Sequence, residues 1–246
     1  MSTVLRWDAL TRDEVAAAAP GALLVVPTGT TEQHGPHLAT GTDAFIAEAV
    51  AERAAAVAAE PETVLIAPTL PYGASHHHLP FGGTLSLSVD TFQRVLADLL
   101  ESAAAAGCTR VFVLNAHGGN AHACASAVAE ASRLHGIVAA TALVSDLVDP
   151  EAVDGPLRGH AGSFETSLML ALAANRVRPD RASASPGGPA RRRARGLVVA
   201  EPGRWQELDG FTDRPDEATA ARGEQALAAC VEAAAAAFAE VAQAGG

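Results

Sequence analysis

A continuous apolar run near the start of the chain is followed directly by a polar segment punctuated with glycine: Ala22-Leu-Leu-Val-Val26, then Pro27-Thr-Gly-Thr-Thr-Glu32-Gln-His34-Gly-Pro-His37-Leu-Ala-Thr-Gly-Thr-Asp43. A run of apolar residues that does not alternate with polar ones, and that is bounded by turn-forming residues, is typical of a strand buried on both faces. The segment Asp43–Ala59 that follows has apolar residues at three- and four-residue spacing, which predicts a helix. Strand, polar loop and helix in this order predict one unit of a parallel sheet.

The same alternation continues along the chain. Strand patterns recur at Val64–Ala67, Arg110–Leu114, Ile137–Leu143 and Leu197–Ala200, and helical patterns at Val89–Ala106, Asn120–His135, Ser163–Ala174 and Asp216–Ala242. Thr42, Ser88 and Asn120 are predicted helix caps, because their side-chain oxygens can accept hydrogen bonds from free helix amides. The alternation predicts an α/β fold in which helices cover a mostly parallel central sheet.

Length and composition indicate one globular domain. The 246 residues are 49% hydrophobic and 18% charged, a balance that can bury a sizeable core. The stretch Asn175–Arg195, rich in Pro, Arg, Ser and Gly, is predicted to be an exposed excursion, because too little chain follows it to build a second core. We therefore expect a single domain over residues 1–246.

Charge and apolar patterning argue against several classes of partner. A net charge of −11 repels phosphate backbones, and 4% aromatic residues leave few platforms for base stacking, so no nucleic acid partner is expected. The long apolar stretches carry Glu, Arg or Asp, and Met1–Trp7 lacks a basic segment followed by an apolar core, so we expect no membrane span or export. Three widely spaced cysteines in apolar patterns predict buried, reduced thiols and a cytoplasmic protein.

The unusual polar residues lie in the loops that follow the predicted strands. Besides the segment quoted above, these loops are Tyr72-Gly-Ala-Ser75-His76-His77-His78-Leu-Pro-Phe-Gly-Gly-Thr84, Asn115-Ala-His117-Gly118-Gly119-Asn120 and Gly159-His160-Ala-Gly-Ser-Phe-Glu165-Thr166-Ser167. Together the four loops hold seven of the nine histidines. A single loop histidine is usually a surface residue, but loops after parallel strands meet at one sheet edge. Imidazole and carboxylate groups gathered there suit zinc, manganese or iron(II).

Spacing within the loops indicates roles at such a site. Glu32 and His34 are two residues apart, so their side chains can reach two different ions. Asp43, where the loop enters a helix, could bridge two ions with its two oxygens. Gly118 and Gly119 let backbone approach a ligand, and the amides of the helix that follows favour a polarised oxygen. Without a ligand, the same glycines would form only a tight strand-to-helix turn.

Three motifs in this order resemble the creatininase (creatinine amidohydrolase) family. They are Gly29-Thr-Thr-Glu32-Gln-His34-Gly-Pro-His37-Leu with Asp43, Asn115-Ala-His117-Gly-Gly-Asn120, and His160-Ala-Gly-Ser-Phe-Glu165-Thr-Ser167. The resemblance runs from about Leu23 to the C-terminal helix. It implies a three-layer αβα fold and a binuclear metal centre that hydrolyses carbon–nitrogen bonds in cyclic amides, formamides or peptides. It also implies a homo-oligomer, often a hexamer in this family.

The resemblance implies a ligand set for two divalent ions, either zinc, manganese or iron. Glu32 and His117 would hold one ion, His34 would hold the other, and Asp43 would bridge them. Creatininases place a glutamate two residues after the histidine that matches His117, where this chain has Gly119.

A substitute for that glutamate is expected in the fourth loop. Glu165 is the one acid in its motif, and it would begin a helix that faces the same edge. The expected catalytic residues are His160 and Glu165, with His160 protonating the departing nitrogen or, alternatively, orienting Glu165 through a hydrogen bond. The expected substrate-binding residues are Ser75, His78, Gly118, Gly119 and Asn120. The roles of His37, His76 and His77 stay open between ligand, support and solvated loop.

The motifs are closest in wording to the creatininase-like peptidase of mycofactocin maturation and to formamide hydrolases of deazaflavin biosynthesis. The peptidase shares the His-Ala-Gly-x-x-Glu-Thr-Ser string and a late turn like Asp209-Gly-Phe-Thr-Asp213. The cluster Ser75-His-His-His78 differs from its Ser-x-Glu-His pattern. Trp7 and Trp205 lie outside the motif loops, so the aromatic residues that clamp creatinine have no clear counterparts.

We therefore expect a metal-dependent hydrolase of carbon–nitrogen bonds that acts on a small amide or a peptide through water activated by two ions. A mycofactocin precursor peptidase is the alternative within the family. A non-catalytic metal-binding or scaffold protein is the alternative from another class, because a fold and its ligands do not guarantee turnover. A serine hydrolase is disfavoured, because the chain has no Gly-x-Ser-x-Gly motif.

Overall fold

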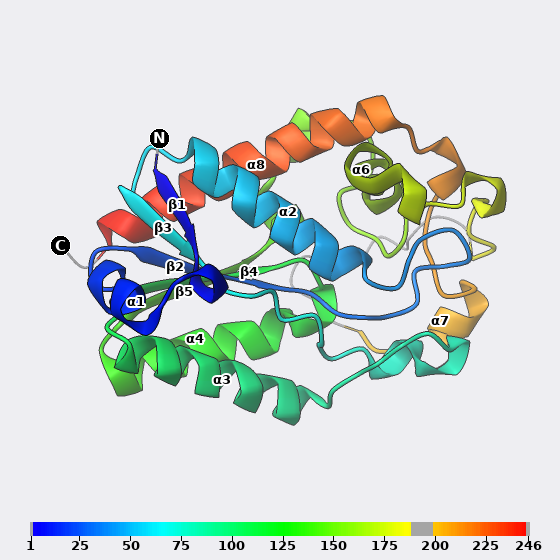
Figure 1. The fold of residues 1–246 in the computed structure, drawn as a ribbon. Coiled ribbons are helices and arrows are strands. Elements are labelled where there is room, and N and C mark those ends of the chain that lie inside the picture. The colour runs from blue at the N-terminus through cyan, green and yellow to red at the C-terminus, as the bar shows by residue number, and fades with distance from the viewer. Residues whose placement is uncertain (1, 188–198, 245–246) are drawn as a thin grey trace.

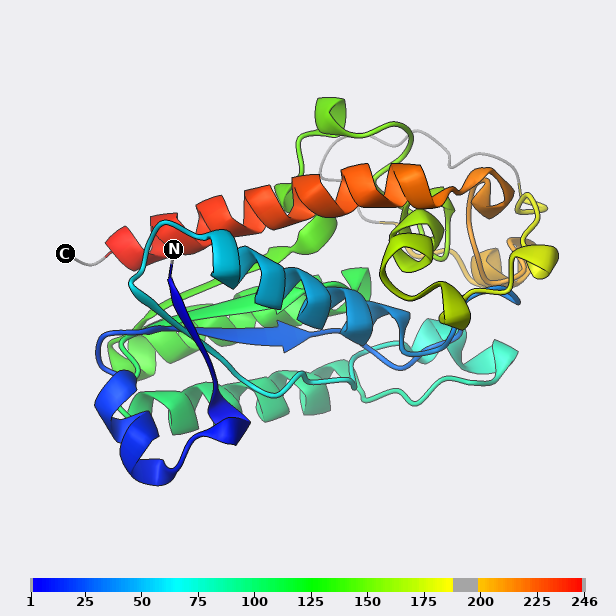
Figure 2. The same ribbon diagram turned by 45° about the horizontal axis from the view of Figure 1, so that its top comes forward.

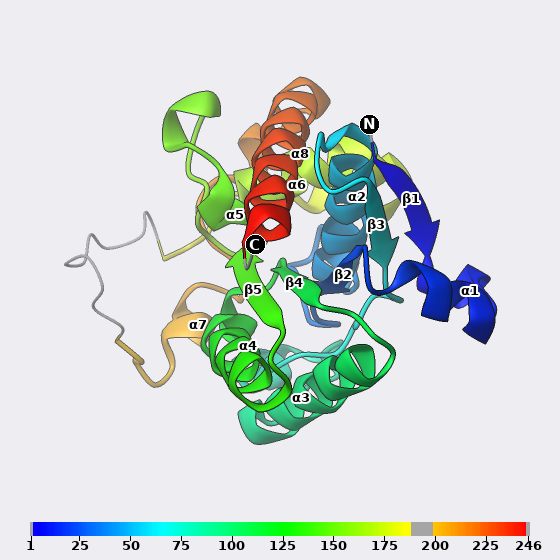
Figure 3. The ribbon, with the colours of Figure 1, turned by 90° about the vertical axis from the view of Figure 1, so that its left-hand side faces the viewer.

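The computed structural model describes residues 2–187 and 199–244. Five strands form one sheet in the order β1-β3-β2-β4-β5 (Figure 3). The strands are β1 (Thr3–Arg6), β2 (Leu23–Thr28), β3 (Thr63–Ile66), β4 (Arg110–Asn115) and β5 (Val138–Leu143). Their pairings are all parallel, with Leu23 opposite both Val64 and Arg110. The predicted mostly parallel central sheet is confirmed.

Helices cover both faces of this sheet (Figures 1 and 3). One face carries α2 (Thr42–Val57), α6 (Ser163–Ala173) and α8 (Ala220–Gln243), and the other carries α3 (Val89–Ala105) and α4 (Ala121–His135). The shorter helices are α1 (Arg12–Ala18), α5 (Val144–Leu147) and α7 (Arg204–Glu207). The arrangement is the expected three-layer αβα fold.

Alternate residues of the central strand β2 enter two separate apolar cores. Leu23 and Val25 pack on the side of α2, α6 and α8, whereas Leu24 and Val26 pack on the side of α3 and α4. Every residue of β2 is buried. A strand covered on both faces needs no polar side, which explains the continuous apolar run in the sequence.

Two strands differ from the sequence-based prediction. The sequence does not predict β1, which is a four-residue edge strand paired with β3 and built from partly exposed residues. Such a segment is too short, and its residues are too exposed, to show a clear apolar pattern in the sequence. The predicted strand Leu197–Ala200 lies partly outside the described residues, and residues 199–200 are not in a strand.

Of the three predicted helix caps, one is confirmed and two are wrong. Ser88 caps α3, and its hydroxyl accepts a hydrogen bond from the Thr91 amide at 3.2 Å. The prediction for Thr42 was wrong, because its hydroxyl lies in the first turn of α2 and donates to the Ala39 carbonyl at 2.7 Å. The prediction for Asn120 was also wrong, because it precedes α4 without bonding its amides. Both side chains hold the polar loops together instead.

The C-terminal helix α8 is long and apolar enough to qualify as a membrane span by length and composition alone. Its residues Cys230, Ala234 and Phe238 are buried in the core that α2 and α6 share. The Phe238 ring meets Phe112 of β4 edge-on, with ring centroids 5.2 Å apart. In this structure α8 is therefore part of a helical layer of the fold.

The three cysteines are free and buried, as predicted.

Candidate metal centre

The loops after β2, β3, β4 and β5 meet beyond the carboxyl ends of these strands (Figure 2). The loop after β2 carries Glu32 and His34 and ends at α2, whose first turn holds Asp43. Gly29 permits this return, because a Cβ there would lie only 2.6 Å from the backbone carbonyl carbon of Asp43. The bare backbone at Gly29 thus lets α2 begin against the strand end and present Asp43 to the loops.

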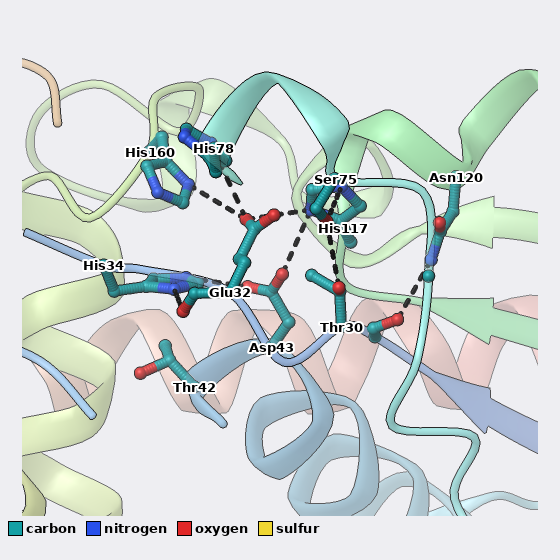
Figure 4. Close-up of polar contacts among 12 residues, drawn as sticks. Thr30, Glu32, His34, Thr42, Asp43, Ser75, His78, His117, Asn120 and His160 are labelled. Atoms are coloured by element: carbon teal, nitrogen blue, oxygen red, sulfur yellow. Dashed lines mark hydrogen bonds and ion pairs between the residues drawn. The ribbon is translucent and has the colours of Figure 1, made fainter. Parts of the chain in front are cut away.

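Two carboxylates and two imidazoles form the centre of the cluster (Figure 4). Nε2 of His34 lies 3.0 Å from Oδ1 of Asp43, and Nδ1 of His117 lies 3.1 Å from Oδ2 of the same carboxylate. Nδ1 of His117 is also 3.2 Å from Oε1 of Glu32. All four side chains are buried. Asp43 therefore presents one oxygen to each imidazole, which is the arrangement expected of a carboxylate that can bridge two cations.

Hydrogen bonds to the backbone fix which nitrogen of each ring faces the carboxylates. Nδ1 of His34 donates to the carbonyl oxygen of Glu32 at 3.1 Å. Nε2 of His117 donates to the carbonyl oxygen of Ala74 at 3.2 Å. The opposite nitrogens point into the cluster, as in histidine ligands whose second nitrogen is anchored by a carbonyl.

Several carboxylate oxygens in the cluster make no hydrogen bond. Both carboxylate oxygens of Glu32 and Oδ2 of Asp43 are buried in this state. Burial disfavours charge on His34, but Asp43 outweighs it and raises the pKa of His34 to about 10. Burial acts likewise on His117, yet Glu32 and Asp43 hold the pKa of His117 well above its usual value. Buried carboxylates need positive charge nearby, and the donor set fits divalent cations.

Glu165, at the start of α6, lies on the His34 side of the cluster. Its Oε2 is 4.0 Å from Nε2 of His34 and accepts a hydrogen bond from the Ala161 amide at 2.6 Å. Burial raises the pKa of Glu165 to about 7. His34, Asp43 and Glu165 offer ligand atoms within 4.8 Å of one another, so the three could surround one cation.

Gly119 has no room for a side chain. A Cβ at this position would clash with Nε2 of His117 and lie 2.6 Å from the carbonyl oxygen of Ala74. These are the two groups whose hydrogen bond anchors the His117 ring. A glutamate at position 119 would disturb that anchor, and Glu165 is the carboxylate that lies near His34 in addition to Asp43.

We expect the substitution Gly119→Ala to destabilise the protein by about 1–3 kcal/mol, because overpacking of a close-packed site costs that much. It should also weaken metal binding, because the His117 ring must shift. Urea unfolding and metal titration measure the two effects. Gly118→Ala is the matched control for stability, since a Cβ there meets nothing within 4 Å. Equal unfolding free energies for the two variants would contradict the steric argument.

His160 faces the cluster from the fourth loop. Its Nε2 donates to the carbonyl oxygen of Gln33 at 2.8 Å, and its Nδ1 lies 3.3 Å from Oε1 of Glu32. Burial lowers the pKa of His160 well below its usual value. Thr212 holds the loop, because its hydroxyl accepts a hydrogen bond from the His160 amide at 2.9 Å. The free nitrogen of a neutral ring and a carboxylate oxygen thus face each other, with a place for a proton or a cation between them.

The sequence did not single out Gln33, which links these histidines. Its Nε2 donates to the carbonyl oxygen of Gly210 at 2.6 Å and to Nδ1 of His78 at 2.8 Å. Its Oε1 accepts a hydrogen bond from the Gly35 amide at 2.9 Å. The sequence could have indicated Gln33 through its position between the candidate ligands Glu32 and His34 in the first motif.

Two residues predicted to bind substrate, Ser75 and Asn120, are fully buried among the loops near His117 (Figure 4). Asn120 is fully buried, accepts a hydrogen bond from the Ala74 amide at 2.9 Å and donates to the carbonyl oxygen of Gly29 at 3.1 Å. The Ser75 hydroxyl is also fully buried and lies 3.3 Å from Nε2 of His117. Both side chains join loops to one another around His117.

The three histidines left open by the sequence have different surroundings. His37 is fully buried and donates from Nε2 to the carbonyl oxygen of Ala161 at 2.9 Å, so it supports the fourth loop. His76 is exposed, and its Nδ1 lies 3.1 Å from the Ser86 hydroxyl. His77 offers a ligand atom within 4.8 Å of those of Glu32 and His117.

A pocket of about 240 Å³ opens onto the cluster. Its described lining consists of Asp43, His77, His78, Ala116, His117, Gly118, Gly119, Gly159, His160, Glu165 and Trp205, and includes no arginine. Trp205 of α7 meets the rings of His78 and His160, at centroid distances of 4.5 and 5.5 Å. No spacing in the sequence links Trp205 to the motif loops, because α7 reaches them only through the tertiary fold.

Comparison with known sequences agrees with the motifs. The profile of the creatininase family, described as creatinine amidohydrolase, matches residues 8–238. The chain is 35% identical over 221 residues to the mycofactocin precursor peptide peptidase of Mycobacterium tuberculosis (strain CDC 1551 / Oshkosh), covering 85% of this chain and 81% of that one. It is 30% identical over 242 residues to the creatinine amidohydrolase of Pseudomonas putida, covering 89% of each.

Comparison with solved structures agrees as well. A mutant creatininase in its zinc–zinc form matches with a TM-score of 0.81 and 28% sequence identity, covering 97% of this chain and 98% of that one. The residues matched by the family profile include the four loops that form the cluster. This chain belongs to the creatininase family.

Proposed function

We propose that this protein is a metal-dependent amidohydrolase that cleaves a carbon–nitrogen bond with water. The observation that carries the proposal is the Asp43 carboxylate, whose two oxygens face His34 and His117 at 3.0 and 3.1 Å. The Glu32 carboxylate, whose two buried oxygens make no hydrogen bond, adds a second negative charge that a cation would balance. Structures of creatininases in zinc–zinc and manganese forms support divalent cations in this family.

The ligand set that we propose holds two ions, of zinc, manganese or iron. Glu32 and His117 would hold one ion, His34 and Glu165 would hold the other, and Asp43, whose oxygens face His34 and His117, would serve both. Each ion then has three protein ligands, which leaves positions for water and substrate, as catalytic metal sites require.

The proposed chemistry combines the ions with groups of this chain. Divalent cations supply Lewis acidity and lower the pKa of water, which provides hydroxide near neutral pH. His160 takes the proton of the attacking water at Nδ1, the atom that faces Glu32, and passes it to the departing nitrogen. The water oxygen becomes bonded to the carbonyl carbon as the carbon–nitrogen bond breaks. Gly118 and Gly119 line the pocket, and their backbone amides are the groups that we propose donate to the developing oxyanion.

The shape of the site supports a substrate with an apolar group beside its amide. A second cavity of about 230 Å³ shares Ala116, Gly118, Gly159 and Glu165 with the pocket at the cluster. Its lining combines the charged residues Asp146 and Arg158 with apolar side chains, which include Leu143, Leu157, Phe164 and Leu168. Together the two cavities accommodate a small amide or a peptide end.

We further propose a cytoplasmic homo-oligomer with neither nucleic acid nor membrane as partner. The net charge of −11 supports the absence of a nucleic acid partner. Leu79 and Leu85, in the loop after β3, and Val89, at the start of α3, are 47–59% exposed, and we propose that they contact a second copy. Light scattering of the purified protein measures the oligomeric state, and a monomer at micromolar concentration would contradict this assignment.

The proposed activity is tested by reconstituting the purified protein with zinc, manganese or iron(II) in turn. Each form is assayed against cyclic ureas, lactams, formamides and peptides with free carboxyl ends. We expect metal-dependent hydrolysis of the carbon–nitrogen bond in at least one class, by ring opening or by release of an amine, and no hydrolysis after treatment with a chelator. Stoichiometric metal without turnover of any compound would instead favour a non-catalytic metal-binding protein.

We expect Glu165→Gln to lose one of the two ions while keeping the other. The substitution preserves size but removes the charge that would join His34 and Asp43 around one cation. Metal analysis after gel filtration measures the stoichiometry, with the exposed Glu130→Gln on α4 as control. If Glu165→Gln retains two tightly bound ions, the second site is built from other residues.

A further inference from the structure

The loop after β3 brings a further imidazole to the Glu32 side of the cluster. His77 lines the pocket and offers a ligand atom within 4.8 Å of those of Glu32 and His117. The neighbouring His76 differs, because its Nδ1 lies 3.1 Å from the Ser86 hydroxyl and it belongs to none of the metal-ligating sets found among the described residues. Two adjacent histidines on one turn are thus directed to different surroundings.

Aromatic packing holds the His77 ring in this place although part of it is exposed to solvent. The ring lies nearly parallel to His117, at an interplanar angle of 9° and a centroid distance of 6.1 Å. It also contacts His78 at 4.2 Å and Trp205 at 5.5 Å, measured between ring centroids. A side chain packed among three rings loses less freedom when it binds an ion, so its position favours ligation.

The buried carboxylate oxygens on the Glu32 side of the cluster also favour a cation there. Both carboxylate oxygens of Glu32 are buried without a hydrogen bond, and so is Oδ2 of Asp43, which faces His117. Glu32, Asp43 and His117 would give an ion three protein donors. A fourth donor at the mouth of the pocket completes the four-coordinate shell that zinc prefers.

We propose that His77 is the fourth protein ligand of the ion held by Glu32, Asp43 and His117. The inference rests on the proposed function, because it assigns a ligand to one of its two ions. It would make the two sites unequal: the Glu32 ion would have two imidazoles and two carboxylates and no longer an open position in a four-coordinate shell, whereas the His34 ion would keep the positions for water and substrate. The additional imidazole favours zinc, cobalt or iron over magnesium at the first site.

The test compares His77→Phe with wild type in metal binding. Phenylalanine keeps a ring to pack against His78, His117 and Trp205 but has no nitrogen. Titration with zinc in competition with a chromophoric chelator measures the affinity of each site. We expect the zinc affinity of one site to fall by about 100-fold and that of the other site to stay unchanged. This is the upper end of what is lost when a metal ligand loses its hydrogen-bonding partner. The visible spectrum of the cobalt-loaded protein should change as well, because the ion loses a nitrogen ligand.

Two further variants separate ligation from packing. His77→Glu restores a donor and should keep most of the affinity, whereas His76→Phe makes the same change one residue earlier and should alter neither affinity nor spectrum. If His77→Phe binds two zinc ions as tightly as wild type, with an unchanged cobalt spectrum, His77 is not a ligand. If wild type itself binds no divalent ion, the proposed function fails, so the two failures are distinguishable.

Discussion

Replacing Asp43 by alanine is expected to remove both ions and nearly all activity. Its two oxygens lie 3.0 Å from His34 and 3.1 Å from His117, so one substitution takes a ligand from each site. Metal catalysis of this kind is worth several kcal/mol, and each 1.4 kcal/mol is about tenfold in rate, so turnover should fall by at least about 10³-fold. Metal analysis and the amide assay measure the two losses.

The comparison with His34→Ala gives the Asp43 prediction its specificity. His34 contacts one oxygen of Asp43, whereas His117 faces the other, so His34→Ala should release one ion more readily than the second. Asp98→Ala, at an exposed carboxylate on α3, is the control for the loss of charge alone. If Asp43→Ala keeps two tightly bound ions at wild-type stoichiometry, Asp43 does not bridge them.

His160→Ala is expected to lower turnover by about 10²–10⁴-fold while the ions and the substrate affinity remain, because that is the usual contribution of a general acid or base. Nε2 of the ring donates to the Gln33 carbonyl, so Nδ1 is the nitrogen that can accept and release a further proton. Steady-state kinetics and metal analysis on the same preparation measure the effect. His122→Ala, at an exposed histidine on α4, is the control.

The metal content of His160→Ala distinguishes a proton-transfer role of His160 from a role as metal ligand. Glu32, His34 and His160 also offer ligand atoms within 4.8 Å of one another, so the ring could hold an ion instead. Loss of an ion from His160→Ala would make His160 a ligand. Near-normal turnover with both ions present would show that the proton comes from elsewhere, with Glu165 and His78 as the next residues to replace.

The fold could be predicted from the sequence because strands buried on both faces leave a strong signal. Residues of β2 alternate between two apolar cores, so every position must be apolar and the run is unmistakable. An edge strand such as β1 lacks this signal, since its residues are partly exposed and its one neighbour is β3.

The candidate site was predictable where chemistry and chain position coincide. Glu32, His34 and Asp43 lie in one loop after a strand, and parallel strands bring such loops to the same edge. The motif also directed attention to Glu165, whose carboxylate lies 4.0 Å from the His34 ring. That Gly119 excludes a side chain could not be read from the sequence, because the obstacle is a backbone carbonyl from another loop.

Roles that depend on tertiary contacts were not predictable. Asn120 has the residue type of a helix cap, yet its amide bonds Ala74 and Gly29 from two other loops. Trp205 enters the pocket from α7, where no local pattern indicates that it meets His160. In each case the partner is distant in sequence, so only the assembled fold defines the contact.

The measurement that tests the central claim most directly is anomalous diffraction from crystals of the metal-reconstituted protein. We predict two peaks about 3.5–4 Å apart, the spacing of two-metal sites, with the Asp43 carboxylate between them. One peak should lie against Glu32 and His117, and the other against His34 and Glu165. A single peak, or two peaks that do not share Asp43, would contradict the account.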